Sequence, residues 1–111
     1  MKDPDILLLQ MQALANPVRL WIITQLYHHG EQYVSELARV AKISRPLLKM
    51  HLKKLEDAGL VVSEIGTAEN GKSANFYRVT PFNLSLNPRT IARTNPKPTS
   101  LANQNNGDEN V

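Results

Sequence analysis

The sequence predicts a mainly helical α+β fold, with three to five helices and a two- or three-stranded β-hairpin. Two helical segments, Ser35–Ala41 and about Arg45–Ala58, are separated by a turn of only three residues. Two β-like segments, Leu60–Ile65 and Asn75–Thr80, flank the turn-forming pair Asn70-Gly71. This order of elements is that of a helix-turn-helix followed by a β-hairpin wing.

Each predicted helix begins after a residue whose side chain can accept hydrogen bonds from free backbone N–H groups, and three of these residues precede a proline. Gly30 and Gly59 are natural stops for the second and fourth helices. The first two predicted helices are Pro4 to about Ala15, capped by Asp3, and Pro17 to about His29, capped by Asn16. A short helix capped by Ser35 runs to about Ala41. The last two are Arg45 to about Ala58, capped by Ser44, and Pro88–Arg93, capped by Asn87.

Two further segments have strand-like patterns. Gln32–Val34 is compatible with a short strand before the third helix. Phe82, Leu84 and Leu86 alternate with polar residues, so they are compatible with an extension of the sheet.

The composition changes after Pro81, where the last 31 residues contain seven Asn and four Pro. Such a segment buries too little apolar surface to offset the entropy of ordering the chain. We therefore predict one domain over residues 1–94 and a disordered polar tail over residues 95–111.

Composition and charge exclude several classes of protein. The 111 residues have a formal net charge of +3 and contain no cysteine, which excludes disulfides, iron–sulfur clusters and thiolate metal sites. The charge favours an anionic partner. No apolar run approaches the roughly 20 residues that span a membrane, and Asp3 and Asp5 argue against a signal peptide. We predict a cytoplasmic protein that does not associate with membranes.

The first helix carries more apolar residues than one buried face requires. The excess suggests a second face that packs on another subunit. The predicted dimer contacts are Ile6, Leu7, Leu9 and Met11, and residues 82–94 are compatible with joining them.

The helix after Ser44 is apolar on one face and basic on the other. Leu48, Leu52 and Leu55 form the stripe expected to be buried. A basic face alone is most often just solvated, but the turn before it and the wing after it favour DNA binding. The predicted DNA-binding residues are Ser44, Arg45, Pro46, Lys49, Met50, Lys53, Lys54 and, at the wing tip, Lys72.

These residues are expected to contact different parts of the DNA. Arg45 lies in the first turn, which usually points into the major groove, and it can bind guanine through two hydrogen bonds. The lysines are expected to neutralise phosphates, which positions the helix without specifying sequence. For Lys72, a polar turn without a ligand is an equally good interpretation.

No constellation of residues predicts catalysis, a metal or a cofactor. Ser35, His51 and Asp57 have the residue types of a hydrolase triad, but they lie within one small helical unit without a nucleophile elbow. His28 and His29 point about 100° apart on a helix, so they are poorly placed to share a metal.

The rival hypothesis is a winged helix that binds an acidic protein instead of DNA.

The sequence resembles the ArsR/SmtB family of winged-helix regulators over about Gln12 to Thr80. The segments that carry the resemblance are ALANPVRLWIITQL, EQYVSELA, ISRPLLKMHLKKLEDAGLV and FYRV, although related families such as MarR share parts of the pattern. The resemblance implies a homodimeric, DNA-binding transcriptional repressor that an inducer generally releases from its operator.

The chain departs from the family's metal-binding patterns. Tyr33 and Ser35 stand where thiol-sensing members have two cysteines around a valine. Other members bind zinc or nickel between C-terminal helices through Asp, His and Glu, whereas this C-terminal segment has no His and only Asp108 and Glu109 as acids. The resemblance therefore predicts a repressor that is not a thiolate metal sensor, and it names no inducer.

Overall fold

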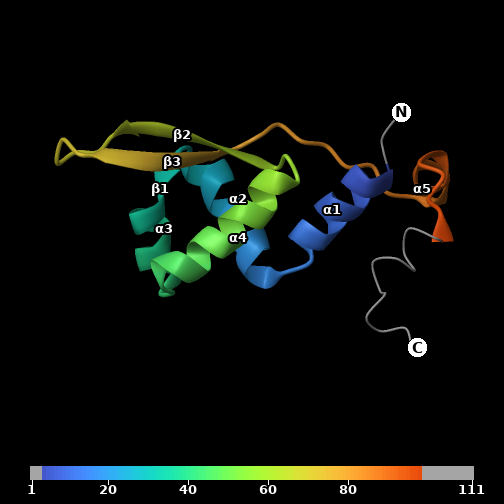
Figure 1. Ribbon diagram of the computed structural model, residues 1–111, viewed down its shortest axis with the longest axis horizontal. Coiled ribbons are helices and arrows are strands. Elements are labelled where there is room, and N and C mark those ends of the chain that lie inside the picture. Colours follow the sequence, from blue (N-terminus) through green and yellow to red (C-terminus); the bar gives the residue numbers. More distant parts are fainter. Residues whose placement is uncertain (1–3, 99–111) are drawn as a thin grey trace. The chain divides into compact units, whose positions relative to one another are not determined.

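The structure, a computed structural model, describes residues 4–98, which form five helices and three strands (Figure 1). The predicted Asp3 cap and the part of the predicted polar tail from residue 99 lie outside the described residues. In chain order the elements are α1 Pro4–Leu14, α2 Pro17–His29, β1 Gln32–Tyr33, α3 Val34–Ala41, α4 Arg45–Asp57, β2 Val61–Thr67, β3 Ser73–Val79 and α5 Pro88–Arg93.

The described chain divides into two compact units. The larger unit is Leu9–Asn83 and holds the helix-turn-helix and the wing. The smaller unit combines residues 4–8 with residues 84–98, so it contains the first residues of α1 together with α5.

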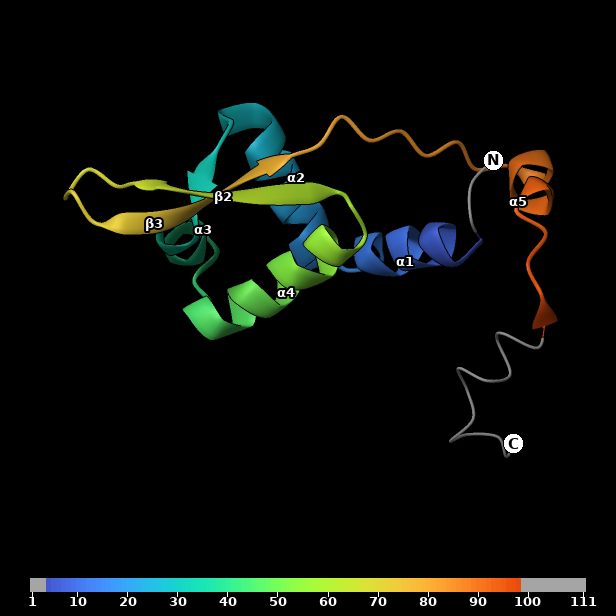
Figure 2. The same ribbon diagram turned by 45° about the horizontal axis from the view of Figure 1, so that its top comes forward.

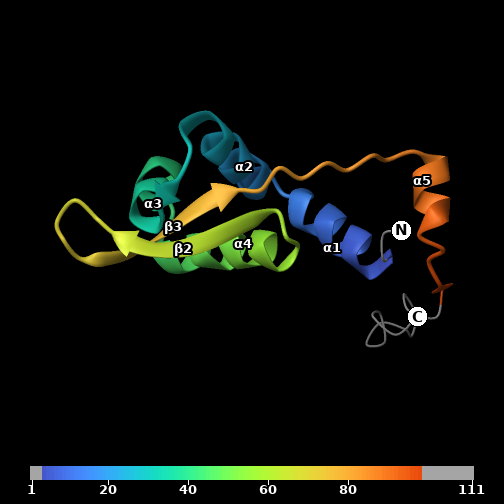
Figure 3. The same ribbon diagram turned by 90° about the horizontal axis from the view of Figure 1, so that it is seen from above.

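The sheet is antiparallel with strand order β1-β3-β2. Val61 lies opposite Val79 and Thr67 opposite Ser73, so β2 and β3 pair over their full length. Figure 2 shows this hairpin extending past α3, with its tip away from the helices. Seen from above, α4 runs alongside β2 (Figure 3), and the two elements are in contact.

The core of the larger unit lies where α2, α3 and α4 meet the sheet. The apolar stripe predicted for α4 is confirmed, because Leu48, Leu52 and Leu55 are each 0% exposed. Burial of a side chain of this size contributes about 1.5–3 kcal/mol. The other large side chains that are almost completely buried are Ile22, Leu26, Leu37, Leu60 and Val61.

Most predicted helix starts are confirmed. Asn16 Oδ1 accepts hydrogen bonds from the backbone N–H of Val18 at 2.8 Å and Arg19 at 3.2 Å. Asn87 and Thr90 cap α5 reciprocally, each side chain accepting from the backbone of the other. These bonds satisfy N–H groups that have no partner inside a helix.

The predicted Ser35 cap is wrong. Helix α3 begins at Val34, so its N-cap residue is Tyr33, two residues before Ser35, and Tyr33 makes no capping hydrogen bond through its side chain. The reason is that Tyr33 pairs with Phe76 in the sheet, and the chain passes directly from this strand into the helix.

The strand bounds also differ from the prediction. The ladder closes around a shorter turn, because Gly66 pairs with Ala74 and both residues belong to strands. At the other end Phe82, Leu84 and Leu86 do not extend the sheet. The backbone N–H of Thr80 still bonds to Leu60 O. The following residue is Pro81, which has no N–H to donate and so does not continue the ladder.

Among residues 4–98, no single helix is long and apolar enough to cross a membrane. The pair Ile6–Leu14 and Pro17–His29 reaches the length and composition only when taken together, and it is bent by 92°.

Candidate nucleic-acid interface

The turn between α3 and α4 sets the direction of the basic helix. Lys42 ends α3 in the left-handed region at φ 60°, and its N–H bonds to Ala38 O. Ser44 then caps α4, as predicted, by accepting a hydrogen bond from Leu47 N at 3.2 Å. This short connection packs α3 against α4, so burial of the leucine stripe leaves the opposite face of α4 in solvent.

The exposed face of α4 brings together the residues predicted to bind DNA. Met50 is 61% exposed, and an apolar side chain at this position on the face fits contact with a thymine methyl group. Arg45 and Lys49 are exposed and, within the described chain, are in no ion pair. The remaining predicted residues of this face are also exposed: Ser44, Pro46, Lys53 and Lys54.

Lys53 differs from the other cations because it already has a partner. Its Nζ lies 3.0 Å and 3.3 Å from the two carboxylate oxygens of Asp57, one helical turn further on. This hydrogen bond, with the charge of Asp57, raises the pKa of Lys53 above its ordinary value. To contact a phosphate, Lys53 must leave Asp57.

The wing tip is the five-residue turn from Ala68 to Lys72. Ala68 N donates to Lys72 O at 2.8 Å, and Gly71 N donates to Ala68 O at 2.9 Å. Lys72 is exposed at the end of this turn. Arg78, further down β3, lies 3.8 Å from a carboxylate oxygen of Glu64 across the hairpin.

An aromatic anchor holds the wing to β1. The rings of Tyr33 and Phe76 lie 4.3 Å apart between centroids, and the Tyr33 hydroxyl donates to Thr67 O at 3.1 Å. The Phe76 ring also covers Gly66 so closely that an added Cβ would lie 2.2 Å from Phe76 Cε2. The anchor was not predicted, because its partners are more than 30 residues apart in the sequence.

Tyr33 therefore anchors the wing through its ring and its hydroxyl group. Ser35 is exposed on α3. The residues present do not fit a thiolate metal centre, since the 111 residues contain no cysteine. Within residues 4–98, no three His, Cys, Asp or Glu side chains are grouped as metal ligands.

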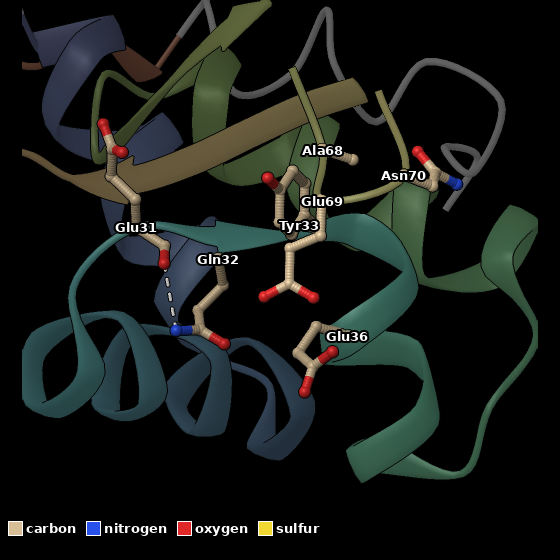
Figure 4. A pocket seen from close by; sticks show the side chains of 7 residues that line it. All are labelled: Glu31, Gln32, Tyr33, Glu36, Ala68, Glu69 and Asn70. Carbon is tan, nitrogen blue, oxygen red and sulfur yellow. Dashed lines mark hydrogen bonds between the residues drawn. The ribbon is translucent and has the colours of Figure 1, made fainter. Parts of the chain in front are cut away.

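A cavity of about 500 Å³ lies between the start of α3 and the wing tip (Figure 4). Three of its lining side chains are the carboxylates of Glu31, Glu36 and Glu69, and none is basic. Its other lining residues are Gln32, Tyr33, Ala68 and Asn70. Phosphates would be repelled by this lining, so we do not include the cavity in the basic face.

Arg19 joins three parts of the larger unit and was not predicted to do so. It is only 9% exposed. Its Nε donates to Ala13 O at 2.6 Å and its Nη2 to Gln12 O at 3.3 Å, both at the C-terminal end of α1. Its Nη1 lies 3.0 Å from Nδ1 of His51 on α4. The only sequence signal was an arginine early in α2, within the Asn-Pro-x-Arg-Leu motif.

The surroundings of His51 favour its neutral form. Burial is the largest effect, and the charges of Arg19 and Lys54 act in the same direction, so the pKa of His51 is lowered below 6.5. An arginine offers only donors. His51 Nδ1 therefore accepts the hydrogen bond from Arg19, and the ring proton resides on Nε2.

The predicted dimer residues of α1 differ in how much surface they leave free. Ile6 is 47% and Leu9 43% exposed, whereas Met11 is half-buried. Leu7 is only 7% exposed within the chain. Exposed apolar side chains also occur after the wing, at Leu86 and Ile91.

The helix-turn-helix and its antiparallel wing define a winged helix-turn-helix protein, as predicted. The family model described as bacterial regulatory protein, arsR family, matches residues 16–63. The chain is 32% identical over 82 residues to an uncharacterised HTH-type transcriptional regulator of Methanocaldococcus jannaschii, and the match covers 74% of this chain and 84% of that protein. The chain belongs to the ArsR family of transcriptional regulators, which are not enzymes.

A second relative is the HTH-type transcriptional repressor SmtB of Mycobacterium tuberculosis. It is 41% identical over 75 residues, which are 68% of this chain and 51% of that protein. The chain thus spans about half the length of this relative.

Solved structures share the fold. An ArsR family transcriptional regulator superposes with a TM-score of 0.60 at 25% identity, covering 95% of this chain and 92% of that one. The homodimeric winged helix-turn-helix DNA-binding domain of a possible ArsR-family regulator from Mycobacterium bovis superposes with a TM-score of 0.58 at 20% identity, covering 92% and 82%.

Proposed function

We propose that this chain is a homodimeric transcriptional repressor that binds double-stranded DNA through the exposed face of α4 and does not sense metals through thiolates. The observation that carries the proposal is that α4 combines a fully buried leucine stripe with an opposite face of exposed cations and one exposed methionine. Such a face suits insertion into a major groove, where cations meet phosphates and an apolar side chain meets bases.

The proposed DNA contacts fall into two groups. Arg45, Pro46 and Met50 would face base edges. The cations Lys49, Lys53 and Lys54 would contact phosphates, Ser44 would orient the first turn of the helix, and Lys72 at the wing tip would reach the neighbouring backbone.

A fluorescence anisotropy titration tests DNA binding directly. Duplexes selected by the protein from a random pool are compared with a scrambled duplex of equal length, at low and at moderate salt. We expect the selected duplex to bind at least a hundredfold more tightly, since specific sites typically exceed non-specific DNA by more than that. Absence of binding at low salt, where phosphate contacts are strongest, would contradict the proposal and favour a protein partner.

The proposed dimer rests on apolar surface. Ile6 and Leu9 on α1 are nearly half exposed, and Leu86 and Ile91 add further apolar surface. Ile6, Leu86 and Ile91 belong to the smaller unit, which supports a contribution of residues 82–94 to the interface.

Sedimentation equilibrium tests the dimer. The wild-type chain is expected to sediment as a dimer at tens of micromolar, while the pair Ile6→Glu and Leu9→Glu, which places charges in the contact, should give monomer. The pair Thr24→Glu and Gln25→Glu on α2 serves as a control for added charge. A wild-type monomer at this concentration would overturn the dimer.

The repressor role is proposed from the relatives, one of which is described as a transcriptional repressor. A reporter fused to a promoter that contains the selected site should show lower expression when the chain is present. Higher expression would make the protein an activator.

A further inference from the structure

We propose that Arg19 and His51 form a polar clamp that holds α4 at a fixed position against the C-terminal end of α1, and thereby sets the spacing of the two recognition helices in the dimer. The inference rests on the proposed DNA-binding dimer. It assigns a positioning role to two residues that contact neither the DNA nor the partner subunit in that proposal.

The first part of the clamp is the attachment of Arg19 to α1. The carbonyl groups in the last turn of a helix have no partner within the helix, and they carry the negative end of its dipole. Arg19 donates to two of them, those of Gln12 and Ala13. The cation is buried, and its hydrogen-bond partners among the described residues are two backbone carbonyl groups and an imidazole nitrogen, so the negative end of the α1 dipole faces it.

The second part is the bond between Arg19 and His51. His51 lies on α4 between the buried leucine stripe and the basic face, one residue before the fully buried Leu52. The guanidinium of Arg19 is planar and rigid. Two of its nitrogens bond to α1 and the third bonds to α4. Rotation of α4 relative to α1 would therefore break at least one of the three bonds.

In a dimer, this local contact would fix the distance between the two recognition helices. If α1 packs on the partner, each recognition helix is placed relative to the dimer axis through its own α1. Half-sites on DNA recur about one helical turn apart, and both recognition helices must match that distance at once. A clamp between α1 and α4 reduces the number of spacings that the free dimer samples, which lowers the cost of ordering on binding.

The clamp depends on the protonation state of His51, because a protonated ring would place two cations in hydrogen-bonding contact. The charged groups around His51 are Arg19 from α2 and Lys54 from its own helix, and residues 6–14 of α1 contain no ionisable side chain. The carboxylates of neighbouring elements have other partners: Glu36 bonds to Arg39, Glu56 accepts from Ser63, and Glu64 pairs with Arg78. No carboxylate among these is available to stabilise a charged imidazole.

A distance measurement in the dimer tests the clamp without DNA. The chain has no cysteine, so Lys49→Cys gives each protomer one spin label, on the exposed face of α4. Double electron–electron resonance then reports the distance between the two recognition helices. At pH 7.5 we expect a narrow distance distribution in the labelled Lys49→Cys chain. Adding Arg19→Lys to this chain should broaden it, because lysine cannot bridge three acceptors. Arg39→Lys, at an exposed position of α3, is the matched control and should leave the distribution narrow.

The pH dependence separates positioning from a general structural role. On lowering the pH stepwise from 7.5 to well below 6.5, the distribution should broaden in the otherwise wild-type chain as the pH passes the lowered pKa of His51. It should remain narrow in His51→Gln, whose side-chain carbonyl can accept from Arg19 and does not titrate. The pair His28→Gln and His29→Gln should behave like the wild type. Circular dichroism confirms at each pH that the helices persist.

Affinity provides the functional readout. Arg19→Lys should weaken binding to a duplex with two selected half-sites by roughly tenfold, because a dimer that samples more spacings must lose more conformational freedom on binding. Binding to a duplex with one half-site should change less than twofold.

The outcomes are distinct. An unchanged distance distribution in Arg19→Lys overturns the clamp, as does acid-induced broadening in His51→Gln. A chain that gives no dipolar signal between protomers is not a dimer, which overturns the clamp through the proposed function. A chain that dimerises with a narrow, clamp-dependent distance but binds no duplex leaves the clamp supported and contradicts DNA binding instead.

Discussion

At the scale of single residues, exposure and pairing rank the cations of the proposed interface. Arg45 and Lys49 are exposed and unpaired among the described residues, whereas Lys53 is held by Asp57. The sequence pattern predicts the same phosphate contact for Lys53 as for the other lysines, because the pattern does not show whether an acid one helical turn away is a partner or only a solvated neighbour. An exposed pair of this kind contributes little to stability, so DNA can displace it at small cost.

The two unpaired cations are expected to differ in what they recognise. Arg45→Ala should reduce the preference for selected over scrambled DNA by roughly 5- to 150-fold, because a bidentate contact to guanine is worth about 1–3 kcal/mol. Lys49→Ala should weaken both duplexes alike and reduce the salt slope by roughly one. Anisotropy titrations at three salt concentrations measure both effects. Equal loss of specificity in the two variants would contradict this division of roles.

Release of Lys53 should strengthen binding. Asp57→Asn removes the carboxylate that holds Lys53 and also removes a negative charge from α4. We expect affinity for scrambled DNA to rise about two- to tenfold at low salt, with a steeper salt slope. Glu31→Gln, an exposed acid outside α4, is the control for net charge, and an equal gain in that variant would show that the pair itself has no influence.

At the scale of elements, the wing depends on one small residue. Gly66 lies in β2 with ordinary strand geometry, and the Phe76 ring occupies the space where a side chain would be. The same ring packs on Tyr33 of β1. Phe76 therefore connects all three strands near the point where the hairpin leaves the body of the domain.

Gly66→Ala is expected to displace Phe76 and loosen the wing. Overpacking of this kind usually costs about 1–3 kcal/mol, which corresponds to a fall in melting temperature of roughly 4–8 °C per kcal/mol for a domain of this size. Thermal unfolding followed by circular dichroism measures the fall. Ser73→Ala, an exposed position on β3, should change stability by less than about 0.5 kcal/mol. If Gly66→Ala is equally mild, the ring does not hold the wing.

At the scale of the whole molecule, the partly buried contact of Arg19 with His51 makes stability depend on pH. The pKa of His51 is lowered below 6.5 in the folded chain. As the pH falls below 6.5, the unfolded chain takes up a proton that the folded chain resists, so the unfolded state binds more protons and stability decreases. The contribution is fully present above pH 6.5 and is lost as the pH falls through the lowered pKa.

Chemical denaturation at a series of pH values between 7.5 and 5 measures this effect. The free energy of unfolding should fall with decreasing pH in the wild type more steeply than in His51→Gln. The pair His28→Gln and His29→Gln should retain the wild-type slope. Parallel slopes for wild type and His51→Gln would show that His51 titrates alike in the folded and unfolded chains.

The sequence by itself determined the order of elements, the helix starts at Asn16, Ser44 and Asn87, and the buried and basic faces of α4. These features depend on neighbours within about one turn of helix or a few residues of strand, so local patterns report them. Only the tertiary structure decided the start of α3 at Val34, the aromatic anchor of the wing and the bonds of Arg19 to α1 and α4. Each of these joins elements through contacts that folding brings together, and a side chain's hydrogen-bonding capacity does not reveal which distant partner it will meet.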